Sequence, residues 1–369
     1  MNETVMEWIC RFDGEPQDWR FIKKVFPDGW EEQARELGAF TRKHGIRSPA
    51  DLMRVMLMHL SEGYSLRQTA VRAKESGLCE VSDVALLKRL RHCQEWFCWI
   101  HKKLITDLPL DKAELLPGRQ VRLVDGSVVC EPGAKETTWR IHYSIDLSSM
   151  ACDEALLSST KEGETLTRFS VKTGDVLIGD RGFAHRRGIR HVIKQGGDVI
   201  VRLNLQNVPL ETESGEVFNI LQQVRTLNHE QTGHWRVQIR DTEGVIPAQL
   251  CVFRKSVEAT QKAQDRLRKD TQKKRQIKPE TLEAAGYVFV LTTLKEVPSE
   301  TVLELYRARW QIELAFKRLK SLLRVGHLKK KDPIGAKAWL QGKLLVAALI
   351  EKLIALGKLF SPQTNCGER

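Results

Sequence analysis

The chain has 369 residues, of which 41% are hydrophobic and 29% charged, a composition typical of a globular protein with two or three domains. Lys and Arg number 59 against 47 Asp and Glu, and this formal net charge of +12 indicates a polyanionic partner, most simply nucleic acid. The most apolar run near the C-terminus, residues 344–350, is too short for a membrane span, which needs about 20 residues. The eight scattered cysteines indicate reduced thiols in a cytoplasmic protein.

Residues 1–105 are expected to be helical. The stretch SLRQTAVRAKESG opens with Ser65, a helix N-cap residue, and ends at Gly77, which suits a helix C-cap. VSDVALLKRLRH follows, with Ser82 as a second N-cap. Two short helices, a glycine turn and a basic second helix predict a DNA-binding helix-turn-helix, with a plain helical hairpin as the alternative. The basic side chains that would meet phosphates or bases are Arg67, Arg72, Lys88, Arg89 and Arg91.

The end of this region contains four residues of the types that bind zinc, His92, Cys93, Cys98 and His101. Their spacing does not match the short loops between paired ligands of finger-like sites. Cys93, Trp96, Phe97 and Ile100 instead recur at the spacing of one helix face. The pattern therefore favours core packing over metal binding.

From Arg119 the pattern changes to strands. The expected strands are VRLVDGSVV, TWRIHYSIDL, TLTRFSV and VLIGD, followed by the basic helix HRRGIRHVIKQGG and the strand DVIVRLNL. This order predicts an α/β sheet with a central apolar strand. A histidine can act as a proton shuttle, but nothing in the pattern around His185, in the basic helix, requires that role.

The next segment, residues 205–253, is expected to be rich in strands such as HWRVQIRD and AQLCVFRK. Residues 254–278 then carry ten Lys and Arg against three acids, which predicts either a phosphate-facing basic arm or a solvated helix. YVFVLTTL returns to strand, and helices are expected from there to the end of the chain.

One of those helices contains YRARWQIELAFKRLK. At about 100° per residue, Tyr306, Arg309, Glu313 and Lys320 fall on one narrow face. An adjacent apolar face would dock on the sheet; it consists of Leu305, Ile312, Phe316, Leu319 and Leu323. The simpler interpretation of Arg309 and Glu313 is an ordinary ion pair between residues four apart.

Two aspartates join Glu313 as candidates for metal binding. Asp125 lies within an apolar strand, where a carboxylate is costly unless it is paired or binds a metal. Asp180 ends an apolar strand, where α/β proteins place ligands. Each alone could be a turn or capping residue, but three carboxylates together are the ligands that two Mg²⁺ ions need to bridge a phosphodiester.

These residues resemble a known family. The spacing of Tyr306, Arg309, Glu313 and Lys320 is similar to the Tyr-Arg-Glu-Lys signature of the IS-four group of bacterial insertion-sequence transposases. VDGS around Asp125 and GDRGF around Asp180 look like the first two acidic motifs of that group, and the resemblance covers positions 60–355. It implies an α/β fold with a ribonuclease-H-like core, a β-rich insertion and a helical N-terminal DNA-binding domain.

The resemblance also implies how the chain divides. The expected parts are a helical N-terminal domain (1–105), the first part of the core (106–204), the insertion with its basic arm (205–285), the rest of the core with the glutamate helix (286–330) and a helical C-terminal region (331–369).

The implied activity is cutting at the ends of an insertion sequence and joining them to target DNA. Asp125, Asp180 and Glu313 would be the catalytic residues, holding two Mg²⁺ or Mn²⁺ ions for phosphoryl transfer. Tyr306, Arg309 and Lys320 would contact double-stranded DNA. Arg181 is a further candidate, as is Trp235 for stacking a flipped base. A homodimer on paired DNA ends is expected, with no membrane partner.

Two rival functions remain at this point. One is a non-catalytic end-binding protein or repressor that uses the helix-turn-helix and the basic arm. The other is a different ribonuclease-H-like nuclease, against which the Tyr-Arg-Glu-Lys helix and the long insertion speak. For Arg181, an exposed surface ion pair is an equal alternative to a DNA contact.

Overall fold

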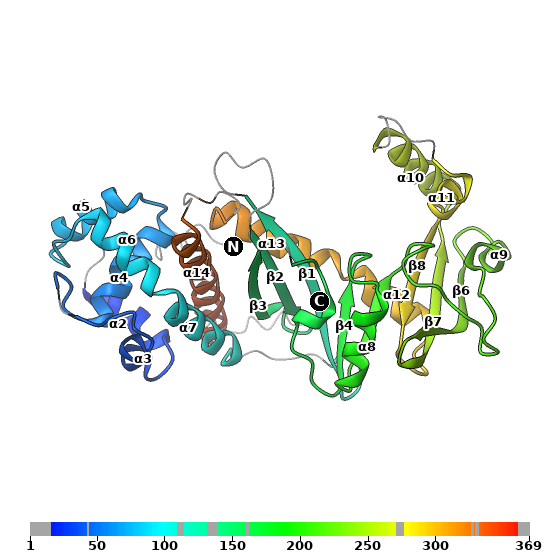
Figure 1. Cartoon of the computed structure of the whole chain (residues 1–369), viewed down its shortest axis with the longest axis horizontal. Coiled ribbons are helices and arrows are strands. Elements are labelled where there is room, and N and C mark those ends of the chain that lie inside the picture. Colours follow the sequence, from blue (N-terminus) through cyan, green and yellow to red (C-terminus); the bar gives the residue numbers. More distant parts are fainter. Residues whose placement is uncertain are drawn as a thin grey trace, which may run out of the picture.

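The computed structural model describes residues 16–42, 44–108, 114–130, 139–159, 162–270, 277–325, 328 and 332–360. The molecule is elongated, with a helical region at one end and a single mixed sheet running through the rest (Figure 1). The sheet has eight strands in the order β3-β2-β1-β4-β5-β8-β7-β6. One hydrophobic core extends from the N-terminal helices into the first strands, and a second lies around α8 and the distal strands.

The described part of the N-terminal region is helical, as predicted, whereas residues 1–15 lie outside the described residues. Its helices are α2 (Pro16–Val25), α3 (Trp30–Glu36), α4 (Pro49–Ser61), α5 (Leu66–Glu75), α6 (Asp83–His92) and α7 (Gln94–Thr106). The last helix of the chain, α14 (Pro333–Phe360), packs against α7, α6 and α4 (Figure 1). The two ends of the sequence therefore form one helical layer, which also contacts β3.

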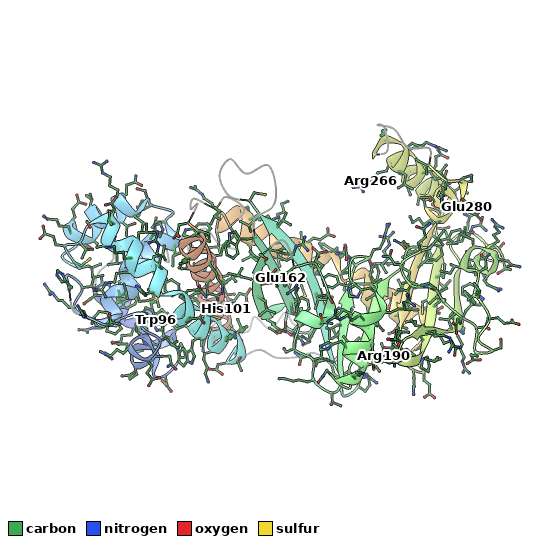
Figure 2. The ribbon with its side chains drawn as sticks, in the orientation of Figure 1. Trp96, His101, Glu162, Arg190, Arg266 and Glu280 are labelled. Carbon is green, nitrogen blue, oxygen red and sulfur yellow. The ribbon has the colours of Figure 1, made fainter. Side chains whose placement is uncertain are left out.

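Core packing at the end of this region is confirmed. Cys93, Trp96, Phe97 and Ile100 are all fully buried. The Trp96 ring, labelled in Figure 2, stacks on Trp30 with centroids 5.8 Å apart, and its Nε1 donates to the Trp30 carbonyl at 2.7 Å. Burial raises the pKa of the Cys93 thiol and lowers that of His101 to about 4, so both are neutral side chains inside the core.

The first half of the sheet agrees with most of the expected strands. They are β1 (Gln120–Val129), β2 (Trp139–Asp146), β3 (Ala151–Ser159), β4 (Asp175–Gly179) and β5 (Asp198–Arg202), with α8 (Arg186–Lys194) between the last two. β2 and β3 form antiparallel pairs next to β1, whereas β4 and β5 run parallel to it.

One predicted strand is wrong. TLTRFSV forms no strand; residues Leu166–Arg168 are a short 3-10 turn with Leu166 buried. The third strand is ACDEALLSS, which pairs with β2 directly after a tight turn. This strand was not among those expected from the sequence. Its two consecutive acids, Asp153 and Glu154, both form ion pairs with the buried Arg122, which compensates their burial.

The strands that follow β5 in the sequence continue the same sheet. β8 (Tyr287–Thr292) pairs with β5, and β7 (Gly244–Arg254) and β6 (Thr232–Asp241) extend the sheet outward. Short helix α9 (Ile220–Val224) packs beside them, and α10 (Val257–Asp270) with α11 (Pro279–Ala284) projects away from the sheet (Figure 1). Of the predicted basic arm, residues 271–276 lie outside the described residues.

The helix expected to carry Tyr306 through Lys320 is in fact two helices, α12 (Ser299–Arg307) and α13 (Trp310–Leu322). Around Ala308 and Arg309 the backbone hydrogen bonds tighten to a spacing of three residues, as when Arg309 N donates to Tyr306 O at 3.0 Å. Tyr306 therefore does not share a continuous helix with Glu313. The expected apolar face is confirmed: Ile312, Phe316 and Leu319 are buried, and the Phe316 ring contacts Tyr143 of β2.

Candidate active site at the edge of the central strands

Two adjacent parallel strands bring the predicted aspartates together. Leu123 of β1 pairs with Ile178 of β4. Asp125 and Asp180 follow two residues after these, each in the direction of its own strand. Each carboxylate accepts a hydrogen bond from a following glycine: Gly126 N at 2.7 Å for Asp125 and Gly182 N at 2.7 Å for Asp180. Both acids thus lie side by side where β4 ends, the part of an α/β sheet at which ligands commonly bind.

Glu313 reaches this edge through Arg309. The Arg309 Nη1 lies 3.6 Å from Asp125 Oδ2, and Nη2 donates a hydrogen bond to Glu313 Oε1. The Asp125 and Arg309 side chains are only 15% and 19% exposed, whereas that of Glu313 is 58% exposed. The ion pair between residues four apart is therefore real, but it is also part of a bridge between two of the three predicted catalytic carboxylates.

The electrostatic environment matches a crowded acidic site. Burial raises the pKa of Asp125 to about 6; the Gly126 amide opposes this, the nearby Asp180 adds to it, and Arg309 opposes it. Burial acts to lower the pKa of Arg309, but its hydrogen bond to Glu313 and the nearby acids outweigh this and raise it. Like charges concentrated beside Asp125 favour binding of a cation.

A fourth carboxylate, missed in the sequence, lies among these residues. Glu164 precedes the 3-10 turn, and its side chain lies against the glycines of both aspartate motifs. A Cβ built on Gly126 would lie 2.6 Å from Glu164 Oε1, and one built on Gly182 would lie 3.0 Å from Glu164 Oε2. No periodic pattern marks this residue, because it lies in a loop between strands.

The donor set fits divalent cations in its chemistry, since Mg²⁺ and Mn²⁺ prefer carboxylate oxygens. Gly126 and Gly182 also leave a cradle that a side chain at either position would fill. In the described part of the chain, no three acidic, histidine or cysteine side chains are gathered closely enough to hold a metal ion. Arg309 is one reason for this separation, because its guanidinium lies between the carboxylates of Asp125 and Glu313.

Beside the acids lies a basic cluster formed by Arg181, Arg202 and Lys255. Arg202 ends β5, the strand next to β4, and Lys255 follows β7. Burial and then the charge of Arg202 lower the pKa of both Arg181 and Lys255. Within the described residues none of the three forms an ion pair with an acid, although Lys255 Nζ donates to Ala285 O at 2.7 Å. Sequence reasoning found only Arg181, because strand ends that meet at one sheet edge are not visible in one dimension.

The other candidates are spread over the molecule. Lys320 is exposed on α13, and Tyr306 is partly buried at the end of α12. Trp235 lies on β6, five strands from β1, which is about 24 Å at ordinary strand spacing. His185 is the N-cap of α8, where its Nδ1 accepts from Gly188 N at 3.2 Å. That contact is a structural role.

The helix-turn-helix candidates also differ in their surroundings. α5 and α6 form in the predicted places, with Ser65 and Ser82 as N-caps. Arg89 donates to the carbonyl of Arg42 at 2.9 Å, and Arg91 pairs with Asp332 at 2.8 Å just before α14. Arg72 lies over the Tyr64 ring. Lys88 and Arg67 are both exposed.

Comparison with known proteins decides the family. The family model described as "Transposase DDE domain" matches residues 154–349, more than half of the chain. The chain belongs to the DDE transposase family. The match includes Asp180 and Glu313, whereas Asp125 precedes it.

Relatives of this DDE transposase support the same family over nearly the whole length. The InsL product of insertion sequence element IS186A of Escherichia coli strain K12 is 35% identical over 352 residues, which are 93% of this chain and 95% of the relative. The transposase for insertion sequence element IS421 of Escherichia coli is 35% identical over 353 residues, with the same coverage. The transposase for IS231F of Bacillus thuringiensis subsp. israelensis is 27% identical over 49% of this chain and 42% of the relative. Among the described residues, no helix is long and apolar enough to cross a membrane.

Proposed function

We propose that this protein is a DNA transposase that cuts at the ends of its insertion sequence and joins them to target DNA by two-metal phosphoryl transfer. The observation that carries the proposal is the placement of Asp125 and Asp180 side by side on parallel strands of a chain that belongs to the DDE transposase family. The names of the relatives, transposases of insertion sequence elements, point to the same substrate, the DNA ends of such an element.

The sheet order supports a ribonuclease-H-like core. β1, β2 and β3 form an antiparallel unit, and β4 and β5 add to the other side of β1 in parallel. The first aspartate then lies on the central strand and the second at the end of its neighbour. β6 and β7, which lie between β5 and β8 in the sequence, form the β-rich insertion.

We assign Asp125, Asp180 and Glu313 as the ligands of two Mg²⁺ or Mn²⁺ ions, which when bound would activate the attacking oxygen and stabilise the departing one. Glu313 can take this role once Arg309 releases it. Arg309 is 19% exposed and lies at the rim of the acidic site, so a DNA phosphate is a suitable replacement partner for it. Tyr306 and Lys320 would contact the same DNA.

The basic cluster supplies the remaining charge for DNA. Arg181, Arg202 and Lys255 repel one another in the free protein, and a phosphate backbone beside Asp180 would relieve that repulsion. Positioning and electrostatic stabilisation are the main contributions that a protein makes to phosphoryl transfer. No protein nucleophile is needed in this scheme.

We further propose that α5 and α6 bind DNA as a helix-turn-helix, that Trp235 stacks a base, and that the active form is a homodimer. Joining two ends requires two such sites held together on one DNA. Light scattering of the protein with and without DNA ends tests the dimer. A monomer with both ends bound would contradict it.

Single amide substitutions test the activity: Asp125→Asn, Asp180→Asn and Glu313→Gln. Each should abolish Mg²⁺-dependent cleavage of DNA that contains the element's end, while gel-shift binding of that DNA stays close to wild type. Glu304→Gln, an exposed residue of α12, is the control. If wild-type protein binds the ends but cuts nothing with either metal, the non-catalytic end-binding alternative is correct. If the amide variants still cut, the ligand assignment is wrong.

A further inference from the structure

Among the described residues, Glu164 is the acidic side chain that lies against the glycines of both aspartate motifs. One of its oxygens, Oε1, lies 2.6 Å from the Cβ position of Gly126, the residue after Asp125. The other, Oε2, lies 3.0 Å from the Cβ position of Gly182, and Asp180 Oδ1 lies 3.1 Å from that same point. The Glu164 and Asp180 carboxylates therefore converge on one small space.

That space exists because both neighbouring positions are glycine. Any side chain at position 126 would meet the Glu164 carboxylate well inside van der Waals contact, since its Cγ and Cδ lie only 2.9 and 3.0 Å from the Cβ position. Neither glycine has a positive φ, so backbone conformation does not require glycine here. Close approach of the carboxylate is the physical reason that remains.

The negative charge of the Glu164 carboxylate has few compensating partners among the described residues. Its nearest cationic partner among the described residues is Arg140 of β2, whose Nη1 lies 3.8 Å from Oε1. No other described residue donates a hydrogen bond to it. The Glu164 side chain is 26% exposed. Repulsion between the Glu164 carboxylate and Asp180 would be relieved by a cation bound between them.

We propose that Glu164 is a fourth ligand of the site, supplying an oxygen to the divalent cation held by Asp125 and Asp180. The inference rests on the proposed two-metal function. Asp125 and Asp180 offer carboxylate oxygens on adjacent strands, and Glu164 approaches them from the loop before the 3-10 turn. There it would add a carboxylate oxygen to the metal-binding set while Arg309 is paired with Glu313.

Metal affinity in the absence of DNA tests the proposal with a readout other than activity. Mn²⁺ binding to the purified full chain is measured by titration calorimetry and by the electron paramagnetic resonance signal of free Mn²⁺. Glu164→Gln should weaken Mn²⁺ binding by about tenfold or more, as expected when a contributor to a metal site is lost. Glu164→Asp keeps the negative charge, but its side chain is one methylene shorter and its carboxylate lies farther from the site. The Mn²⁺ affinity of this variant should therefore fall between those of wild type and Glu164→Gln.

Two controls separate metal binding from folding. Glu162, labelled in Figure 2, lies in the same loop but pairs with Arg168 at 2.5 Å, and Glu162→Gln should leave the affinity unchanged. Arg140→Gln removes the cationic partner of Glu164. If Glu164 only forms that ion pair, Arg140→Gln and Glu164→Gln should lower the unfolding temperature alike and leave Mn²⁺ binding unchanged.

The outcomes are distinguishable from failure of the proposed function. Wild-type affinity in Glu164→Gln, with weakened binding in Asp125→Asn and Asp180→Asn, would overturn the role of Glu164 alone. If all three variants bind Mn²⁺ as tightly as wild type, the proposed two-metal site itself is wrong. Should Glu164→Gln fail to fold, Gly126→Ala, which displaces the same carboxylate, provides the second test and should weaken Mn²⁺ binding similarly.

Discussion

Arg309 joins Asp125 to Glu313: one nitrogen of its guanidinium lies 3.6 Å from Asp125 Oδ2, and the other hydrogen-bonds Glu313 Oε1. The positive charge thus occupies the place where a cation would be attracted. In the free protein it neutralises the carboxylates that metal binding requires. On DNA, the same guanidinium has phosphate oxygens as an alternative partner.

Arg309→Ala should therefore have opposite effects on the two ligands. Mn²⁺ binding without DNA should tighten about fivefold, because removing a partly screened positive charge near the carboxylates contributes on the order of 1 kcal/mol. Binding of DNA ends should weaken, because a phosphate contact is lost. Calorimetry with Mn²⁺ and gel shifts with DNA measure the two effects, with Lys317→Ala, exposed on α13, as control. Weaker Mn²⁺ binding in Arg309→Ala would contradict this account.

If the basic cluster of Arg181, Arg202 and Lys255 contacts phosphates, the affinity for DNA ends should depend on salt concentration through these residues. Each phosphate contact contributes about 0.9 to the slope of log affinity against log salt concentration. Arg202→Ala and Lys255→Ala should each lower the affinity for DNA ends and reduce that slope by about one. Arg236→Ala, exposed on β6 away from the cluster, should leave both unchanged. A slope that does not change in either cluster variant would show that these cations do not meet phosphates.

The two aspartates and the apolar face of α13 were predictable from the sequence because each follows a local pattern of apolar residues. An aspartate inside or at the end of an apolar strand is visible in the sequence, and β1 and β4 are such strands. The apolar spacing of Ile312, Phe316 and Leu319 likewise predicts the face of α13 that docks on the sheet. These signals are local, so one dimension suffices to find them.

What could not be predicted depends on tertiary partners. ACDEALLSS becomes a strand because the buried Arg122 pairs with its two acids, and Arg122 lies about thirty residues earlier. The break at Arg309 arises where α12 and α13 pack on different strands, which a helical wheel cannot represent. Glu164 joins the site only through loop geometry. Sequence periodicity carries no information on any of these.

A pH-dependent stability is predicted for Glu351 of α14, which lines a cavity of about 110 Å³ with Tyr143 and Cys152. Burial raises its pKa to about 7, from an ordinary 4.5. The folded state then holds a proton that the unfolded state releases, so the free energy of unfolding falls as pH rises from 4.5 to 7. Cys152 N and the Tyr143 hydroxyl oppose this rise in pKa, because both donate hydrogen bonds to the Glu351 carboxylate.

Glu351→Gln removes that proton linkage while keeping an acceptor for Cys152 N. The variant should be more stable than wild type at pH 8, and its advantage should shrink by about 2.5 kcal/mol between pH 8 and pH 5. Urea unfolding at both pH values measures this, and Glu304→Gln should show no such dependence. An advantage that is equal at both pH values would mean that Glu351 is ionised in the folded protein.

Three variants, Arg91→Ala, Lys88→Ala and Arg67→Ala, can separate DNA binding by α5 and α6 from the packing of α6 against its neighbours. Arg91 pairs with Asp332 at the start of α14, so Arg91→Ala should lower the free energy of unfolding by up to about 1 kcal/mol, the usual range for an exposed ion pair. Lys88 has no such partner among the described residues, so Lys88→Ala should leave stability unchanged and weaken binding of DNA ends. Thermal unfolding and gel shifts on the same preparations measure both. If Lys88→Ala and Arg67→Ala bind the ends like wild type, α5 and α6 are a structural hairpin, and end recognition must lie with the sheet edge and α13.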